Sequence, residues 1–506
     1  MDEADLRYEY ILALCSAIEQ YTALAIRRNP LAFTYRGADL RFALERYLYF
    51  SHVENHRLLA LFQESRSGKP VISGSFHDPC EASLAQIICP RVIARTSRMR
   101  DFVNMFMVCG RRARRALRTW LRWVEMFLPR LAKQSVSSPP VLVFIAQEKF
   151  ARYLAPILDR LKERCAVLLL SDRYLCEKLR AQGVPTLSVP KGLLPLTSVR
   201  DPIAILDLFA ITETFDRMFA TLIRVRPKCV VLVEGNAPTD EVLNQACKLL
   251  GISTVCIQQG WSPIVHNGFR NMSYGTMLVW GDVFASALAP FNPDQKFQVT
   301  GSHILEQTMR ELPGRNDRKR VAVSFFLQAP GPLISERRFG EFLELLEWTA
   351  LSFPDVPVLV REHPSYRVGE DKREMARSIS NVRFVDPDRV PLADVLAESL
   401  ISVSVYSTTI LESIGAGVIP IIFNATSLPK YYPDLDSFGV AIEVHDLLEA
   451  KNAVASLLND NNRLAALQTA MATFRSCLFG SGQASSTDRI AEAICPKTWG
   501  LQEALP

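Results

Sequence analysis

The chain has no run of about eighteen uncharged apolar residues, so it lacks the sequence signature of a membrane-spanning helix. Its first fourteen residues, MDEADLRYEYILAL, are acidic where a secretory signal carries basic residues. We therefore expect a cytoplasmic protein that is neither exported nor embedded in a membrane.

The usual cysteine and histidine patterns of disulfide and metal sites are also missing. The eleven cysteines, an odd number, are scattered from Cys15 to Cys495 without a CxxC pair, which suits a reducing compartment better than a disulfide framework. The seven histidines form no HExxH or similar ligand pattern. We expect neither a structural nor a catalytic metal site.

Missing motifs and a modest charge argue against three further classes of protein. No GxGxxG or GxxxxGK(S/T) pattern occurs, which argues against a dinucleotide-dependent enzyme and a P-loop NTPase. The net charge is only +5 for 506 residues, and no strand interleaves aromatic and basic residues as RNA-binding sheets do. With 48% hydrophobic and 22% charged residues, the chain can still bury the cores of two or three domains.

The first part of the chain has a helical pattern, which changes near residue 141. Apolar residues recur at three- and four-residue spacing up to about Lys133, for example over residues 40–49, and there is almost no strand signal. A polar stretch, 134–140, predicts a linker. Short β-branched or leucine-rich runs then alternate with helical segments, which is typical of βαβ units and a parallel sheet. Strands are expected at residues 141–146, 166–171, 204–209, 229–234 and 253–258.

A second series of the same kind follows the charged stretch 312–320. Its expected strands cover residues 321–327, 357–362, 382–386, 400–405 and 418–423. We therefore predict an α/β protein with two Rossmann-like domains, preceded by an α-helical domain. The predicted boundaries are 1–135 for the helical domain, 136–301 and 302–480 for the Rossmann-like domains, and 481–506 for a tail whose helix, 487–494, packs back across the other half.

Polar residues follow two strands of the second series, within the segments VLVREHP and VSVYSTTILESIGAGVIP. The second segment then starts a helix that closes on Gly417. The carboxyl ends of parallel strands converge on one crevice, and a helix that begins there presents N–H groups and the positive end of its dipole to an anion. We therefore predict a phosphate site formed by His363, Ser407, Thr408 and Thr409.

Two Rossmann-like domains that lack a dinucleotide-binding motif and a P-loop resemble the GT-B superfamily of glycosyltransferases. The resemblance covers about residues 141–495. The pair His363-Pro364, followed by Ser407-Thr408, is similar to the HP and S-S/T motifs of bacterial transferases that use CMP-activated Kdo or sialic acid in capsule and lipopolysaccharide synthesis. The resemblance implies two domains that face a cleft, with the donor nucleotide on the C-terminal half and the acceptor on the N-terminal half. It also implies that Glu412 holds the ribose hydroxyls of the nucleotide.

These residues also have structural interpretations that involve no ligand. His363 could simply end a strand before a proline as a partly buried histidine. Ser407 and Thr409 could be helix caps, and Thr409 with Glu412 matches a capping box, in which the carboxylate reaches back to a backbone N–H. The capping and ribose-binding roles compete for the one carboxylate of Glu412.

Glu234 is the predicted catalytic carboxylate. The Asp/Glu-Asp/Glu-Gly motif of sialyltransferases is not evident, but Glu234 ends an apolar strand and is therefore aimed into the crevice. There it could take a proton from an acceptor hydroxyl as a general base, or act as a nucleophile or electrostatic stabiliser in a retaining mechanism. Asp240 is the second candidate, although in the first turn of a helix it could merely complement the helix dipole.

Gln258, Gln259 and Gly260 follow the next strand and look like the Q-H-G segment of capsule-synthesis transferases, with glutamine in place of histidine. Gly260 would let the backbone approach a ligand closely, and the two amides could hold sugar hydroxyls in the acceptor site. A tight turn without a ligand is the alternative.

The segment 111–128 is basic on one side and apolar on the other if it is helical. A basic amphipathic helix with tryptophan binds an anionic membrane surface, with about 1 kcal/mol per basic residue near the lipid. Alternatively, its apolar face packs inside the helical domain. The four aligned arginines are Arg111, Arg115, Arg118 and Arg122.

These features together predict a nucleotide-sugar-dependent glycosyltransferase that needs no metal and no cofactor besides its co-substrate. The expected donor is a CMP-activated sugar, and the expected acceptor is a bacterial surface polysaccharide or a lipid-linked glycan at the inner face of the cytoplasmic membrane. A UDP-sugar transferase and a CDP-polyol phosphotransferase are the competing enzymes. A glycan-binding or assembly protein that keeps the fold without the chemistry is the competing non-enzymatic function, and no nucleic acid is expected as a partner.

Overall fold

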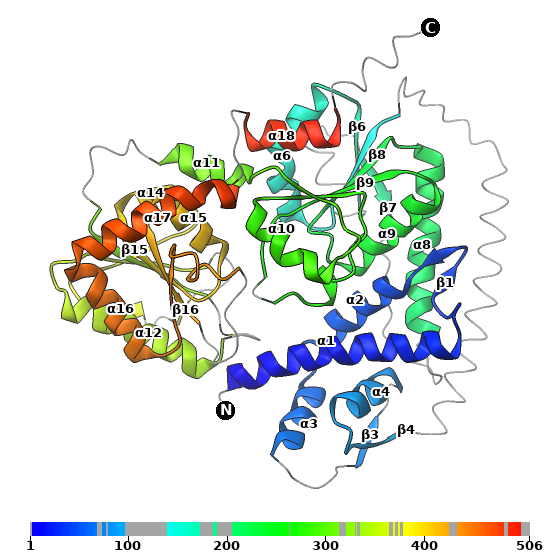
Figure 1. Ribbon diagram of the computed structural model, residues 1–506, viewed down its shortest axis with the longest axis horizontal. Coiled ribbons are helices and arrows are strands. Elements are labelled where there is room, and N and C mark those ends of the chain that lie inside the picture. Colours follow the sequence, from blue (N-terminus) through cyan, green and yellow to red (C-terminus); the bar gives the residue numbers. More distant parts are fainter. Residues whose placement is uncertain are drawn as a thin grey trace. The chain divides into compact units, whose positions relative to one another are not determined.

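The computed structural model forms two compact units (Figure 1). The amino-terminal unit comprises Tyr10–Ile257 and His266–Gly275, and the carboxy-terminal unit comprises Met1–Glu9, Gln258–Val265 and Thr276–Pro496. The structure describes residues 3–67, 73–76, 79–96, 139–172, 186–189, 205–262, 264–312, 320–328, 330, 334–363, 368–369, 373–374, 378–424, 433–479 and 484–496. Side chains are described at all of them except 3–4, 73–76, 79, 93–96, 172, 186–189, 205–210 and 479. Pro364 and the four arginines of the segment 111–128 lie outside these residues.

Among the described residues before β5 (Val141–Phe144), helices are more extensive than strands. The expected helix over residues 40–49 forms as α2 (Arg41–His52), and its side chains are buried along most of its length. The prediction of almost no strand in this region was wrong, because two short two-stranded sheets form, one antiparallel and one parallel. Strands of two and four residues are too short to show an alternating pattern. The elements are α1 (Glu3–Arg28), β1 (Thr34–Tyr35), β2 (Ala38–Asp39), α2, α3 (His56–Arg66), β3 (Ser73–Phe76), α4 (Pro79–Ile88) and β4 (Ile93–Thr96).

The amino-terminal unit contains five parallel strands in the order β9-β8-β5-β6-β7. Four of them match expected strands, and β7 was not expected. The helices of this unit include α6, α8 and α9, and a short 3-10 helix, η1, lies in the loop after β9. The bounds are β5 (Val141–Phe144), α6 (Glu148–Lys162), β6 (Val167–Asp172), β7 (Thr186–Val189), α8 (Ile205–Val225), β8 (Cys229–Val233), α9 (Pro238–Leu249), β9 (Ser253–Ile257) and η1 (Asn267–Phe269).

The expected strand over residues 204–209 was wrong, because this run begins the 21-residue helix α8. A short apolar run alone does not distinguish a strand from a buried helix. The residues that follow decide the matter: Ile211, Phe215, Met218 and Leu222 are all buried, and their spacing of three and four residues places them on one helix face.

The carboxy-terminal unit contains a six-stranded parallel sheet in the order β14-β13-β12-β15-β16-β17. All five expected strands of the second series are present, and β17 is added at one edge. The parallel pair β10 and β11, with α10 and α11, also belongs to this unit. The bounds are β10 (Thr276–Val279), α10 (Asp282–Leu288), η2 (Ala289–Phe291), β11 (Phe297–Val299), α11 (His303–Glu311), β12 (Ala322–Phe326), α12 (Glu336–Ser352), β13 (Val358–Arg361), β14 (Val382–Val385), α14 (Leu392–Glu398), β15 (Ser399–Ser404), α15 (Thr408–Ala416), β16 (Ile419–Phe423), β17 (Ile442–Val444), α16 (Leu447–Asn459), α17 (Asn461–Phe479) and α18 (Ser486–Ile494).

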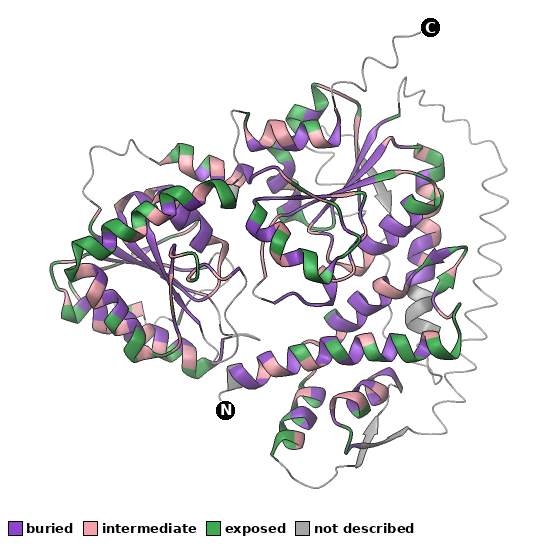
Figure 2. Cartoon of the chain, in the orientation of Figure 1, coloured by how far each residue is buried: buried purple, intermediate pink, exposed green. Residues whose placement is uncertain are grey.

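Four strands, β5, β8, β12 and β16, are almost entirely apolar and are buried on both faces (Figure 2). Every residue of β5, β8, β12 and β16 is buried. This pattern is typical of parallel sheets that carry helices on both faces, because no face of the sheet meets water. Ser324 and Ser402 are buried polar residues inside strands, whereas the candidate site residues Glu234 and Ser407 come after strand ends.

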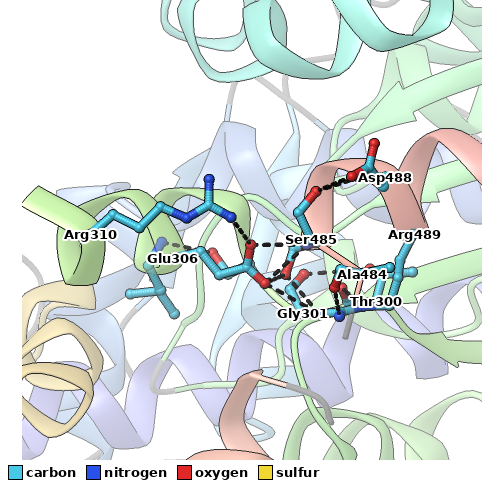
Figure 3. A network of polar contacts seen from close by, with 11 residues as sticks. Thr300, Gly301, Glu306, Arg310, Ala484, Ser485, Asp488 and Arg489 are labelled. Carbon is cyan, nitrogen blue, oxygen red and sulfur yellow. Dashed lines mark hydrogen bonds and ion pairs between the residues drawn. The ribbon is translucent and has the colours of Figure 1, made fainter. Parts of the chain in front are cut away.

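The tail helix α18, expected over residues 487–494, packs against α11 and the end of β11 (Figure 3). The Glu306 carboxylate accepts hydrogen bonds from the Ser486 backbone N–H at 2.9 Å to each oxygen and from the Ser486 hydroxyl. The Arg489 guanidinium donates from Nε to the Thr300 carbonyl oxygen at 2.8 Å and from Nη2 to Glu306 at 3.3 Å. The helix is thus anchored by a carboxylate at its first turn.

Among the described residues, no helix combines the length and the apolar composition that a membrane span requires. The predicted domain boundaries and the predicted cleft remain predictions.

Candidate functional site

In each sheet the strand order reverses at one place, which is called the topological switch point. Open α/β sheets bind ligands at the carboxyl ends of the strands on either side of this point. In the amino-terminal unit the chain runs from β5 outward through β6 to β7, then returns to β8 on the other side of β5. In the carboxy-terminal unit it runs from β12 outward through β13 to β14, then returns to β15. The switch points therefore lie at the carboxyl ends of β5 and β8 in one unit and of β12 and β15 in the other.

Glu234 lies at the switch point of the amino-terminal unit, directly after β8, as the sequence predicts. Its side chain is partly exposed, and burial raises the pKa of its carboxyl group. Two neighbours act in the opposite direction: the ammonium group of Lys149, in the first turn of α6, and a hydrogen bond from the Asn236 side chain. A carboxylate that is partly desolvated and still reachable has the properties of a general base.

The backbone at Glu234 has an unusual conformation. Glu234 has φ 61° and Gly235 has φ 66°, so two consecutive residues are left-handed. For a residue with a side chain this conformation costs roughly 1 kcal/mol or more, and it persists only where the surroundings hold it. The Glu234 N–H donates to the Ile257 carbonyl oxygen of β9 at 2.8 Å.

Asp240, the second catalytic candidate, is instead engaged as a helix cap. Its Oδ2 accepts the Ala237 N–H at 3.0 Å at the start of α9, and its residue is only 2% exposed. Burial raises the pKa of Asp240 to about 7, the Ala237 hydrogen bond and Arg46 oppose this, and Glu234 adds to it. The two candidate carboxylates thus lie close enough to interact, but the exposed one is Glu234.

The switch point of the carboxy-terminal unit brings together Gln328, Tyr406 and the start of α15. The Gln328 side-chain carbonyl, after β12, accepts the Tyr406 N–H, after β15, at 3.1 Å. Ser407 is the N-cap of α15, and its Oγ accepts the Thr409 N–H at 3.2 Å. Thr408 and Thr409 are partly exposed, and the first turn of α15 has no acidic residue. The first turn of α9, by contrast, contains Asp240 and Glu241.

Glu412 does not form the capping box that its spacing from Thr409 suggests. The cap is Ser407, so Glu412 lies five residues farther along α15, beyond the first turn. Its Oε1 accepts the Thr308 hydroxyl of α11 at 3.4 Å, and burial raises the pKa of Glu412 to about 7, with Thr308, Arg361 and Thr409 opposing. A capping box uses the third residue after the cap, and that position is Ile410.

His363 follows β13 at the same edge of the sheet as Ser407, with β12 between their strands. Two strand spacings correspond to about 10 Å, so a shared phosphate would have to bridge that distance or the loop after β13 would have to bend inward. His363 is exposed, and partial desolvation lowers the pKa of its imidazole. The preceding Glu362 is buried and paired with Arg373 at 2.5 Å, and it accepts the Val368 N–H at 2.7 Å. This pairing links Glu362, at the end of β13, to Val368 and Arg373.

Gln258, predicted to hold sugar hydroxyls, uses its amide on the protein backbone instead. Its Oε1 accepts the Trp280 N–H at 3.0 Å, and its Nε2 donates to the Gly260 carbonyl oxygen at 3.1 Å. Gln258 is buried, whereas Gln259 and Gly260 are partly exposed. Within this trio a ligand contact is therefore easier for Gln259 and Gly260.

Several residues of the two switch points carry no signal in the sequence. Gln328, Thr308 and Lys149 belong to no motif, and each reaches its site from a different element. The same is true of Arg46, which lies in α2, about 190 residues before Glu234 and yet hydrogen-bonded to the next residue, Gly235. Within the described residues, no group of three or more His, Cys, Asp or Glu side chains is arranged to hold a metal ion.

Comparisons with known proteins give structural likeness only. No protein-family model matches the sequence, and no curated protein matches it. Among solved structures, the UDP-GlcNAc 2-epimerase of Neisseria meningitidis bound to UDP-GlcNAc is similar at 14% identity, covering 70% of this chain and 98% of its own, with a TM-score of 0.48. MurG of Acinetobacter baumannii is similar at 13% identity, 70% and 99% coverage and a TM-score of 0.45. CalG4, the calicheamicin glycosyltransferase, is similar at 12% identity, 73% and 100% coverage and a TM-score of 0.46.

Proposed function

We propose that this chain is a glycosyltransferase that uses a nucleotide-activated sugar, with a CMP-activated Kdo- or sialic-acid-like sugar as the donor. The observation that carries the proposal is Glu234, a desolvated yet reachable carboxylate at the switch point of one Rossmann-like sheet. A second Rossmann-like sheet provides an independent switch point at which a nucleotide can bind.

The start of α15 is the proposed phosphate site. The positive end of its helix dipole favours an anion, and no acidic side chain in its first turn competes. The hydroxyls of Thr408 and Thr409 add donors, and His363 and Ser407 complete the set that the sequence predicts. Glu412 is the proposed ribose partner, because its carboxyl group lies one turn farther along the same helix.

In the proposed reaction, Glu234 takes the proton of an acceptor hydroxyl as that oxygen attacks the anomeric carbon of the sugar. The bond from the anomeric carbon to the phosphate oxygen breaks, and the negative charge that develops on the leaving phosphate is stabilised by the donors at α15. These donors are proposed to stabilise the phosphate charge by hydrogen bonding, without a metal ion. Gln259 and Gly260 are proposed to position the acceptor sugar.

The proposed acceptor is a bacterial surface polysaccharide or a lipid-linked glycan. A lipid-linked acceptor would make attachment to the inner face of the cytoplasmic membrane useful, and the basic segment with Arg111, Arg115, Arg118 and Arg122 is the proposed contact.

A melting experiment tests the donor class. CMP, CDP, UDP and GDP are added separately, and a ligand that binds only the folded state raises the melting temperature. We expect CMP to raise it most. We expect Ser407→Ala to remove that rise, whereas Ser485→Ala, which removes an equivalent serine cap from α18, leaves it in place.

The other outcomes have definite meanings. A rise with UDP would indicate a UDP-sugar transferase, and a rise with CDP would indicate a polyol phosphotransferase. No rise with any nucleotide would overturn the proposal in favour of a glycan-binding or assembly protein.

A further inference from the structure

Two buried side chains from outside the sheet contact the turn that carries Glu234. The Arg46 Nη1 of α2 donates to the Gly235 carbonyl oxygen at 2.9 Å, and the Tyr274 hydroxyl donates to the same oxygen at 2.7 Å. Arg46 Nη1 also lies 3.1 Å from the Tyr274 hydroxyl, so the three groups form a closed set. All of them belong to the amino-terminal unit.

The turn is also enclosed on its other side. A Cβ atom added to Gly235 would lie 2.5 Å from Cys256 Sγ and 2.8 Å from the Tyr274 ring, so no side chain fits there. Only glycine adopts this left-handed conformation without steric cost, and Glu234 beside it does so against its preference. The hydrogen bonds to the Gly235 carbonyl oxygen therefore oppose a real tendency of the turn to relax.

Stability does not explain why an arginine occupies position 46. Its side chain is fully buried and paired with Glu241 at 3.2 Å, but its Nε and Nη2 have no hydrogen-bond partner among the described residues. Buried donors without partners are costly, and a well-packed apolar side chain is often at least as stabilising as a buried ion pair. Rules of packing are commonly broken at functional positions, and one of the contacts that Arg46 makes is with the Gly235 carbonyl oxygen.

We propose that Arg46 and Tyr274 are positioning residues that hold the Glu234–Gly235 turn in its left-handed conformation and thereby keep the Glu234 carboxylate at the switch point. Helix α2, which precedes both large sheets in the sequence, then contributes to the site by carrying Arg46. The inference rests on the proposed function, because Glu234 is the base of that reaction. It extends the function by assigning a role to the N-terminal helical segment.

Loss of either donor should let the turn relax toward a right-handed or extended conformation. Glu234 would then gain contact with water, and the pKa of its carboxyl group, which burial raises, would fall toward its ordinary value. The titratable and charged groups around this turn are Lys149 of α6, Arg46 of α2, Asp240 and Glu241 of α9, Cys256 of β9, and Tyr274.

Steady-state kinetics with the donor found by the melting experiment form the first test. Tyr274→Phe removes one hydroxyl and little volume, and Arg46→Lys keeps the charge but not the geometry of the donor. We expect each to lower kcat about tenfold to a hundredfold with nearly unchanged KM for the donor, because a misplaced base affects the chemical step. The acid limb of the pH profile should move to lower pH.

The matched control is Tyr10→Phe. Tyr10 is also a buried tyrosine of this unit, and its hydroxyl donates to the His52 carbonyl oxygen at 2.7 Å, at the C-terminal end of α2 rather than at the Glu234 turn. It should lower the melting temperature by a similar amount and leave kcat and the pH profile unchanged. Equal kinetic losses in Tyr10→Phe and Tyr274→Phe would overturn the proposal.

A second measurement does not depend on turnover. A water-soluble carbodiimide with an added amine modifies protonated carboxyl groups, and peptide mass spectrometry reads the modification of Glu234 itself as a function of pH. The midpoint should lie at lower pH in Tyr274→Phe and Arg46→Lys than in the wild type. If Arg46→Lys fails to fold, Tyr274→Phe decides alone.

The two measurements separate the inference from the proposed function. A shifted midpoint in a protein that transfers no sugar from any donor would support the positioning role and overturn the transferase. An unchanged midpoint in the folded variants would overturn the positioning role, whatever the activity.

Discussion

At the scale of single residues, the structure distinguishes Glu234 from Asp240, the two carboxylates that the sequence offers as candidates for the catalytic base. Asp240 accepts a backbone N–H at the start of α9 and is almost fully buried. Glu234 is partly exposed, and its own neighbours are a lysine ammonium and an asparagine amide. The group that a substrate can reach is the better candidate for proton transfer.

We therefore expect Glu234→Gln to lower kcat by about a hundredfold or more, because the amide keeps the shape but cannot accept a proton. Nucleotide affinity should stay unchanged. In the wild type, activity should rise with pH through the raised pKa of Glu234, since only the deprotonated carboxylate acts as a base. The checks are kcat against pH and a nucleotide titration. A near-normal rate in the variant would direct attention to Asp240.

His363→Ala should weaken nucleotide binding by about tenfold to a hundredfold, the loss typical of one hydrogen bond to a charged phosphate. The fold should be unaffected, because His363 is exposed. His445→Ala is the matched control. His445 also directly follows a strand, but that strand is β17, the outermost one of the sheet. Calorimetric titration measures both. Equal affinities in the two variants would remove His363 from the site.

At the scale of elements, helices α9 and α15 begin at corresponding places in their sheets but with opposite electrostatics. The first turn of α9 contains two acidic residues, Asp240 and Glu241, whereas that of α15 contains none. Acidic side chains thus already occupy the positive end of the α9 dipole, while that of α15 remains available to an anion. This difference favours the carboxy-terminal unit as the nucleotide-binding one.

Helix α18 should detach from its unit when its carboxylate anchor is removed. Glu306→Ala leaves the Ser486 N–H and the Arg489 guanidinium without this acceptor, so we expect a loss of about 1–3 kcal/mol in the free energy of unfolding. Arg310→Ala is the control: its side chain is 71% exposed, and loss of its ion pair with Glu306 should cost at most about 1 kcal/mol. Urea denaturation compares them. Equal losses would show that the anchor contributes little.

At the scale of the whole molecule, three buried carboxyl groups make stability depend on pH. Burial raises the pKa values of Glu45, Asp240 and Glu412 to about 7 each. Between about pH 4 and pH 7 the folded chain keeps these protons while the unfolded chain loses them, so the free energy of unfolding should fall as pH rises through this window. Above about pH 7 these groups cause no further loss.

Urea denaturation at pH 5 and pH 7.5 measures this dependence. Glu412→Gln should reduce the difference between the two values, because the amide is uncharged at both. Glu163→Gln, an exposed position, should leave the difference in place. A wild-type protein that is more stable at pH 7.5 than at pH 5 would contradict the expectation.

The basic segment should attach the full-length protein to anionic vesicles but not to neutral ones. Charge attraction and insertion of apolar side chains both contribute, and salt should weaken the first. Changing Arg111, Arg115, Arg118 and Arg122 together to glutamine should release the protein without loss of activity on a soluble acceptor. Co-sedimentation is the measurement. Equal sedimentation of wild type and variant would favour packing of the segment within the protein.

The sequence by itself determined the elements whose signal is local. The apolar runs that became β5, β8, β12 and β16, and the helix that closes on Gly417, are evident because burial and helix termination depend on neighbouring residues in the chain. The same local signal placed Glu234 and Ser407 at the ends of strands. It failed at residues 204–209, where a short apolar run fits a strand and a helix equally well.

Only the tertiary structure decided which residues meet at those strand ends. The order of strands in each sheet puts β12 between His363 and Ser407, and hydrogen bonding shows that Ser407, not Thr409, caps α15. Arg46 and Tyr274 meet at Gly235 from positions far apart in the chain, and Thr308 reaches Glu412 from a different helix. Such contacts depend on how elements pack rather than on spacing along the chain, so periodicity and motif patterns contain no trace of them.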